Sequence, residues 1–221
     1  MHNILKWKME KFMNKCKQVL RCICFLVIAG VIFAGLTNVF ERKTITGVWN
    51  YTAKVNGYFN AQPNSIDVVC FGSSHMYCSI NPIVLEKKYG ISAYVLATQQ
   101  QPVKASYYYM LQALKNQSPK VFIFETFMVN WDKKNLTDAI IADATEPLPM
   151  SLNKLQMIAD LTKGREPKVP YFLTLFKYHD RWKELQRQDF TFERKEMSDA
   201  TKGYVYLEDA TPVTKNLFDQ P

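Results

Sequence analysis

An uncharged apolar stretch from Cys22 to Phe40 constrains what this chain can become more than any other part of its sequence. At about 1.5 Å per residue, a helix over 22–40 would be roughly 28 Å long, close to the ~30 Å hydrocarbon core of a bilayer. The stretch is longer than the ~7–15 apolar residues of a typical secretory signal, and no clear small-x-small cleavage site follows it. We therefore expect a transmembrane anchor over 22–40. A cleaved signal and a buried helix of a soluble protein are the alternatives.

Positive charge is concentrated just before this stretch. The whole chain has 28 Lys and Arg against 20 Asp and Glu, a formal net charge of +8. Residues 1–21 hold one acid, Glu10, and six basic residues: Lys6, Lys8, Lys11, Lys15, Lys17 and Arg21. The positive-inside rule therefore predicts that 1–21 is a cytoplasmic tail and that the chain after the anchor is exported. The exported part is nearly balanced in charge, so nucleic acid is not an expected partner. The predicted anchor makes the lipid bilayer an expected partner.

Cysteine usage is compatible with an exported domain that does not depend on disulfides. Cys16, Cys22 and Cys24 lie in or beside the predicted anchor, which leaves only Cys70 and Cys78 in the exported part. A disulfide scaffold needs more cysteines than this. Cys70 ends an apolar run, so we expect a buried thiol, with a Cys70–Cys78 bridge as the alternative.

Alternating strand and helix patterns indicate the fold of the exported part. After a connector over 41–65, the domain predicted over 66–221 begins with a short apolar run that ends at Gly72. Asn81-Pro82 is typical of a helix start, with Asn as the cap and Pro in the first turn. The predicted order is strand 66–71, helix 82–88, strand 92–98, helix 103–115 and strand 120–129. This alternation favours an α/β fold with a parallel sheet covered by helices. Further helices are expected near 151–161 and over 171–188.

Polar residues stand at or near the carboxyl end of each predicted strand, the edge where open parallel sheets form their sites. They are Gly72-Ser73-Ser74-His75, the segment 98–101 and Glu125-Thr126. A serine nucleophile needs a sharp turn that exposes its oxygen and donors for the oxyanion. The turn at Gly72 provides small residues for this purpose, although Met76 departs from the G-x-S-x-G pattern. On spacing alone, an ordinary turn is the alternative interpretation.

Several of these segments together carry a resemblance to a known family. They are DVVCFGSSHMYCSINP at 67–82, Gln-Gln-Pro at 100–102, Pro-Lys-Val at 119–121, Glu125 and His-x-Arg-Trp at 179–182. The chain resembles the membrane-anchored SGNH/GDSL hydrolase-like proteins of bacteria over most of 45–207. Many of these are similar to partners of membrane-bound O-acyltransferases that modify cell-surface polysaccharides. The resemblance implies a flavodoxin-like three-layer α/β/α fold and cofactor-free ester or acyl-transfer chemistry on a surface glycan. It also implies a single-pass protein of the bacterial cytoplasmic membrane whose C-terminal domain is extracytoplasmic.

The resemblance assigns roles to individual residues. It makes Ser74 the nucleophile, with its backbone N–H as one oxyanion donor. The residues that it places around the oxyanion and substrate are Gly72, Ser73, His75, Gln99, Gln100, Glu125, His179 and Arg181. Two positions depart from the family pattern: the second block has glutamines where the family has an oxyanion glycine, and the third block has Glu125 where it has asparagine. A Gln amide would therefore have to act as the second oxyanion donor.

The catalytic base is the main gap in this assignment. The family places an Asp two or three residues before a late His, and none of His2, His75 and His179 has an Asp at that spacing. We therefore expect that the flavodoxin-like fold is incomplete here and that a missing C-terminal part holds the base and the last strands. A non-catalytic accessory protein of a membrane O-acyltransferase, or an inactive truncated remnant, are the alternative functions. No spacing of Cys and His indicates a metal site.

Three further features each allow two interpretations from the sequence. His75 makes either a structural polar contact or a substrate contact. Residues 179–182 either bind an anionic or sugar ligand through Arg181 and Trp182 or form an amphipathic helix end in which Trp182 is buried. The three tyrosines at 107–109 serve either helix packing or a carbohydrate platform.

Overall fold

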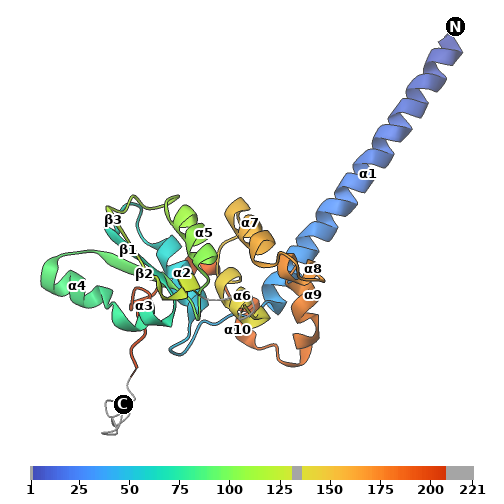
Figure 1. Ribbon diagram of the computed structural model, residues 1–221. Helices are drawn as coiled ribbons and strands as arrows, with labels where there is room; N and C mark the ends of the chain where they lie inside the picture. Colours follow the sequence, from blue (N-terminus) through green and yellow to red (C-terminus); the bar gives the residue numbers. More distant parts are fainter. Residues whose placement is uncertain (1, 131–135, 208–221) are drawn as a thin grey trace. The chain divides into compact units, whose positions relative to one another are not determined.

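The computed structural model describes residues 2–130 and 136–207, without the side chains of residues 2–5 and 8. The chain divides into two compact units, each of which is described by itself. The first consists of Met1–Arg42 and Leu173–Phe192, and the second of Lys43–Phe172 and Glu193–Pro221. Figure 1 labels the helices and strands of both.

The first unit is dominated by helix α1, which runs without a break from His2 to Phe40 (Figure 1). Its part Met9–Phe40 is long and apolar enough to cross a membrane, and this stretch includes the span predicted over 22–40 and begins before it. The helix also includes the basic segment before Cys22, because Lys, Met, Gln and Leu are good helix formers and neither Gly nor Pro interrupts them. The other elements of this unit are α9 (Leu175–Tyr178), η3 (His179–Lys183) and α10 (Arg187–Thr191). The single helix expected over 171–188 is therefore replaced by short pieces.

The second unit contains a parallel sheet of three strands in the order β2-β1-β3. The strands are β1 (Val68–Gly72), β2 (Ala93–Ala97) and β3 (Val121–Phe124). Val68 pairs with Ala93 on one side and with Val121 on the other. The predicted parallel α/β sheet is thus confirmed. The third strand is shorter than expected, because the chain turns at Glu125-Thr126 and continues as η1 (Phe127–Asn130).

Helices connect and cover these strands. They are α2 (Tyr51–Asn60), α3 (Ser74–Ser79), α4 (Pro82–Tyr89), α5 (Val103–Ala113), α6 (Asp138–Thr145), α7 (Leu152–Leu161), α8 (Val169–Phe172) and η4 (Arg194–Glu196). Asn81 caps α4 as predicted, because its side-chain oxygen accepts hydrogen bonds from the N–H groups of Ile83 and Val84. Ser151 likewise caps α7 by accepting the Lys154 N–H at 3.1 Å.

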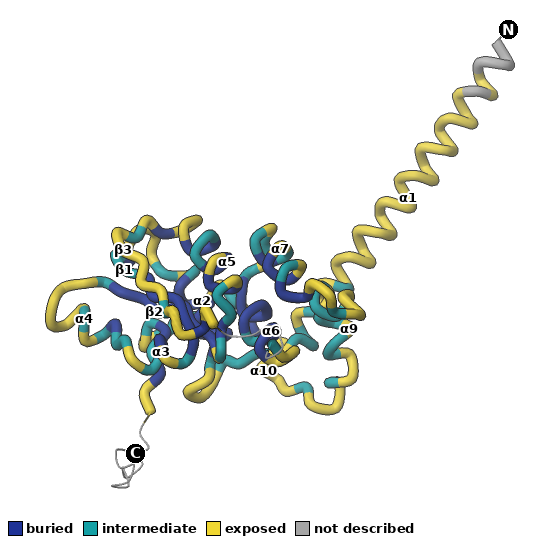
Figure 2. Tube along the Cα trace, in the orientation of Figure 1, coloured by how far each residue is buried: buried dark blue, intermediate teal, exposed yellow. Residues whose placement is uncertain are grey.

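The core lies on both faces of β1 and β2, which are the dark strands at the centre of the second unit in Figure 2. Val69 and Phe71 belong to a cluster that includes residues of α2, α5, α6 and α7. Cys70, between them, points to the other face and belongs to a cluster with Tyr77 and Val205. Cys70 is a buried free thiol, as is expected, and burial raises its pKa to about 11. Cys78 is also a free thiol.

Helix α2 lies within the stretch 41–65 for which the sequence predicts a connector. Every residue from Tyr51 to Tyr58 is buried. Tyr51, Val55 and Tyr58 follow one another at helical spacing, so one side of the helix contacts the core. The polar members are satisfied locally, since Lys54 Nζ donates to the Val48 carbonyl at 2.8 Å. The core of the second unit therefore includes a helix that precedes the first strand.

Candidate functional site

The turn between β1 and α3 brings the predicted serines to the carboxyl edge of the sheet. Gly72 ends β1, Ser73 is extended, and Ser74 is the first residue of α3. A Cβ atom at position 72 would lie 2.5 Å from Glu125 Cβ and 3.0 Å from Met76 Cβ. Real Cβ atoms do not approach other atoms this closely, so the turn requires glycine here.

Glu125 holds this turn from the end of β3. Its Oε2 accepts the Ser73 backbone N–H at 2.5 Å, and its two carboxylate oxygens lie 3.0 and 2.9 Å from Ser73 Oγ, which donates to them. The Glu125 side chain is only 10% exposed. Hydrogen bonds to a carboxylate are stronger than those between neutral groups. The structure thus joins two of the sequence-predicted segments through one side chain.

His75 belongs to the same cluster. Its Nδ1 lies 3.3 Å from Ser73 Oγ and 3.8 Å from Glu125 Oε1, and its ring centroid is 4.2 Å from that of Phe127. The other side of the imidazole is open, since the side chain is 58% exposed. His75 therefore makes a polar contact with Ser73, and a substrate contact through its open side stays a prediction.

The two serines differ sharply in their surroundings. Ser73 is 1% exposed and bound to Glu125, so a substrate has no access to its hydroxyl. Ser74 is half-buried, and its hydroxyl forms no hydrogen bond with any residue in the described part of the chain. Of the two, only Ser74 has an oxygen that can meet a ligand.

The glutamines after β2 are only partly available to a ligand. Gln99 is exposed, and its Oε1 accepts hydrogen bonds from the hydroxyls of Tyr51 at 3.2 Å and Tyr77 at 3.4 Å. This orients the amide and leaves its NH₂ group as the free donor. Gln100 has a φ of 46°, in the left-handed region that non-glycine residues seldom adopt. Gln101 is fully buried and donates to Ser106 Oγ at 2.8 Å, so it stabilises the turn.

His179 and Arg181 lie in the first unit, and the Ser74 turn lies in the second. Arg181 Nη1 donates to the carbonyls of Phe40 at 2.6 Å and Glu41 at 2.8 Å, so this guanidinium caps the C-terminal end of α1. A cation there also complements the helix dipole. Trp182 is 62% exposed, so the expectation of a buried Trp182 is wrong. These contacts give Arg181 a role in holding the end of α1.

The tyrosines of α5 mainly serve packing. Tyr109 is fully buried and donates to the Ala144 carbonyl at 2.8 Å. Tyr108 is 8% exposed and donates to Asp160 Oδ2 at 2.7 Å, and this hydrogen bond together with Lys104 lowers the pKa of the Asp160 carboxyl. Tyr107, at 50% exposure, is the only one of the three that is open to solvent.

A cavity of about 330 Å³ in the second unit was not anticipated from the sequence. The start of α5 forms one wall with Pro102, Val103 and Lys104, and Met128 of η1 contributes another. These segments follow the carboxyl ends of β2 and β3, so the cavity opens at the same edge of the sheet as the Ser74 turn. Its lining mixes apolar side chains with Lys104, Lys163, Arg165 and Asp160.

No group of three or more His, Cys, Asp or Glu side chains in the described ranges 2–130 and 136–207 is placed to hold a metal ion. Comparison of the chain with protein-family models, with curated proteins and with solved structures found no match to any of them.

Proposed function

We propose that this protein is a membrane-anchored serine esterase or acyltransferase of the SGNH/GDSL-like kind that acts on cell-surface polysaccharide. The observation that carries the proposal is the position of Ser74. It begins a helix just after a parallel strand, at the sheet edge where α/β proteins form their sites, and the residue is partly exposed. The flavodoxin-like α/β/α arrangement is proposed with it.

In the proposed reaction Ser74 Oγ bonds to the carbonyl carbon of an ester. The bond to the alcohol oxygen breaks, the serine proton ends on the released alcohol, and the acyl group remains on Ser74 until water or a glycan hydroxyl takes it. The Ser74 backbone N–H and the Gln99 NH₂ group are the proposed oxyanion donors. Ser73 and Glu125 keep the turn in shape without touching the substrate.

The proposed setting follows from the anchor. The domain after α1 would face the outside of the bacterial cytoplasmic membrane, next to a membrane-bound O-acyltransferase that supplies the acyl group. The basic segment before Cys22 supports this orientation through the positive-inside rule.

A second candidate is a non-catalytic accessory protein of the same acyltransferase. The imidazole nearest in sequence to Ser74 is that of His75, and it is engaged with Ser73 and Phe127. A serine without its base retains only the residual catalysis of binding and oxyanion stabilisation.

A fluorophosphonate probe applied to the full chain in detergent micelles distinguishes the proposed enzyme from the non-catalytic accessory protein. Catalysis predicts that the probe labels the wild type and Ser73→Ala and does not label Ser74→Ala, because Ser73 is buried and Ser74 is partly exposed. Labelling that persists in Ser74→Ala overturns the assignment of the nucleophile. Absence of labelling in all three proteins, with their folds shown intact by circular dichroism, favours the accessory protein.

A further inference from the structure

The N-terminal half of α1 carries an apolar stripe that no described side chain of the first unit covers. Five exposed side chains recur on one face at spacings of three, four and seven residues. They are Met9, Phe12, Met13, Val19 and Leu20, which are between 51% and 68% exposed. At 3.6 residues per turn these positions fall within an arc of roughly 120°, the width expected of an amphipathic helix. The stripe precedes the membrane span predicted over 22–40, although it lies within the stretch Met9–Phe40 that is apolar enough to cross a membrane. Inside a membrane span, apolar residues face lipid on all sides and are not confined to one face.

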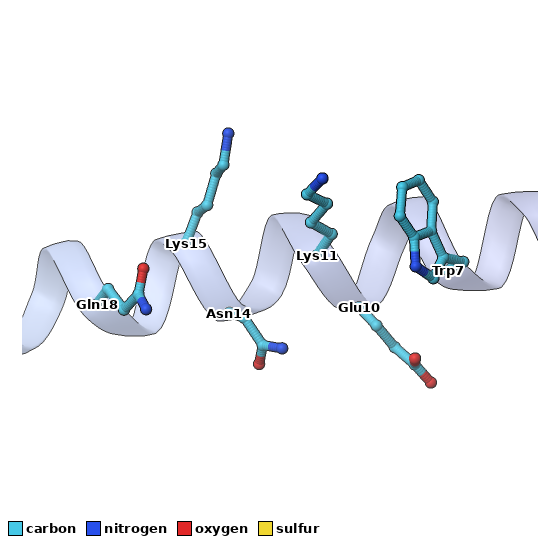
Figure 3. A pocket seen from close by; sticks show the side chains of 6 residues that line it. All are labelled: Trp7, Glu10, Lys11, Asn14, Lys15 and Gln18. Atoms are coloured by element: carbon cyan, nitrogen blue, oxygen red, sulfur yellow. The ribbon is translucent and has the colours of Figure 1, made fainter.

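Polar and basic side chains occupy the opposite face. Figure 3 shows six residues of this half of α1: Trp7, Lys11 and Lys15 project to one side of the helix in this view, Glu10 and Asn14 project to the other, and Gln18 follows them along the helix. Lys11 Nζ lies 4.8 Å from the centroid of the Trp7 ring. Lys6, Lys17 and Arg21 add to the charge of this half of α1, against which Glu10 is the only acid.

We propose that residues 6–21 form an interfacial helix that lies in the plane of the membrane on anionic lipid headgroups. The apolar stripe faces the acyl chains, and the cations of the other face contact the headgroups, with lysines at the edges extending outward to reach them. The proposal rests on α1 entering the membrane over 22–40. It does not depend on any catalysis at Ser74.

Two observations select this occupant. The stripe is continuous with the membrane-spanning part of the same helix, so the headgroup region is the first surface that residues 6–21 meet. The net positive charge of residues 6–21 is complementary to an anionic leaflet, where each nearby Lys or Arg contributes about 1 kcal/mol. The helix is continuous through Arg21 in this structure, so the proposed in-plane state requires α1 to bend there, where the basic segment meets the apolar one.

Spin labels on adjacent positions test the geometry. The full chain, with its five cysteines replaced by serine or alanine, receives one nitroxide at Met13→Cys on the stripe or at Asn14→Cys on the polar face. Each protein is reconstituted into vesicles of phosphatidylcholine, with or without phosphatidylglycerol. With the anionic lipid we expect label 13 to be accessible to oxygen and protected from a water-soluble nickel chelate, and label 14 to show the reverse.

Charge reversal tests the lipid contact. Lys11→Glu with Lys15→Glu is expected to weaken the in-plane state at least ~30-fold, from about 1 kcal/mol per lysine, so that label 13 becomes accessible to the chelate. Lys87→Glu with Lys88→Glu, exposed residues at the end of α4, is the matched control and is expected to leave label 13 protected.

Two outcomes overturn the proposal. If labels 13 and 14 are both open to the chelate in anionic vesicles, the segment projects into water. If label 13 is protected equally with and without phosphatidylglycerol and shows dipolar broadening between labels, a second copy covers the stripe.

Discussion

Glu125 illustrates how a single residue decides the shape of the candidate site. Its carboxylate accepts both the backbone N–H and the hydroxyl of Ser73, and its Cβ leaves no room for a side chain at position 72. The strand predicted over 120–129 runs past Glu125, whereas β3 ends at Phe124 and so puts Glu125 at the carboxyl edge of the sheet. The contact with Ser73 joins residues 52 apart in sequence. Periodicity reports burial and face, so it contains no information about which polar side chains meet.

Replacing Glu125 by Ala is expected to lower the free energy of unfolding by about 2–3 kcal/mol, because the Ser73 N–H and hydroxyl lose a charged acceptor in a buried turn. Urea denaturation of the full chain in a mild detergent, followed by circular dichroism, measures the change. Thr126→Ala, at an exposed neighbouring position, is expected to stay within ~0.5 kcal/mol of the wild type. Equal denaturation midpoints for the two variants would show that Glu125 does not hold the turn.

At the level of whole elements, predictability follows the strength of the local pattern. Strands β1 and β2 are buried on both faces and are short continuous apolar runs, which predicts them well. Helix α2 escaped prediction because Lys54 and Asn56 suggest an exposed segment, although both are buried. The apolar run continues through Phe127 and Val129 and so suggests a longer β3. In the structure the strand ends at Phe124, and the Glu125 side chain after it accepts a hydrogen bond from Ser73.

The buried Lys54 of α2 makes stability depend on alkaline pH. Burial lowers its pKa from 10.5 to about 8, against the opposing effect of Asp199. Between these values the unfolded chain keeps a proton that the folded chain has lost, so the free energy of unfolding rises with pH across this window. Below about pH 8 the folded state bears the full cost of a buried charge.

Substituting Lys54 by Met is therefore expected to raise the free energy of unfolding at neutral pH by about 1–3 kcal/mol and to reduce its increase between pH 8 and 10.5. Denaturation curves at several pH values measure both effects. Lys115→Met, an exposed lysine after α5, serves as the control and should follow the wild type. A Lys54→Met curve parallel to that of the wild type would contradict the assigned cause.

At the scale of the whole second unit, the sheet has one covered side and one open side. Strands β1 and β2 are buried, whereas all four residues of β3 are exposed, with fractions from 37% to 48%. Within the described residues no strand lies beyond β3 in the order β2-β1-β3. The sequence predicts β3 because an apolar run on both faces is typical of an interior parallel strand. β3 is exposed because it lies at the edge of the sheet in the order β2-β1-β3. The composition of a strand does not reveal its position in the sheet.

An open apolar edge strand is a template for pairing with other chains. We therefore expect the full chain in detergent to self-associate through β3, and Val121→Lys with Ile123→Lys to reduce this association, because charges two residues apart on an edge strand oppose the approach of a second strand. Sedimentation velocity across a range of protein concentrations measures the fraction in large species. Val84→Lys, on α4 at 41% exposure, changes the charge of an exposed apolar residue away from the edge. If it reduces association as much as the β3 variant does, the effect is one of net charge and the β3 edge is not the contact.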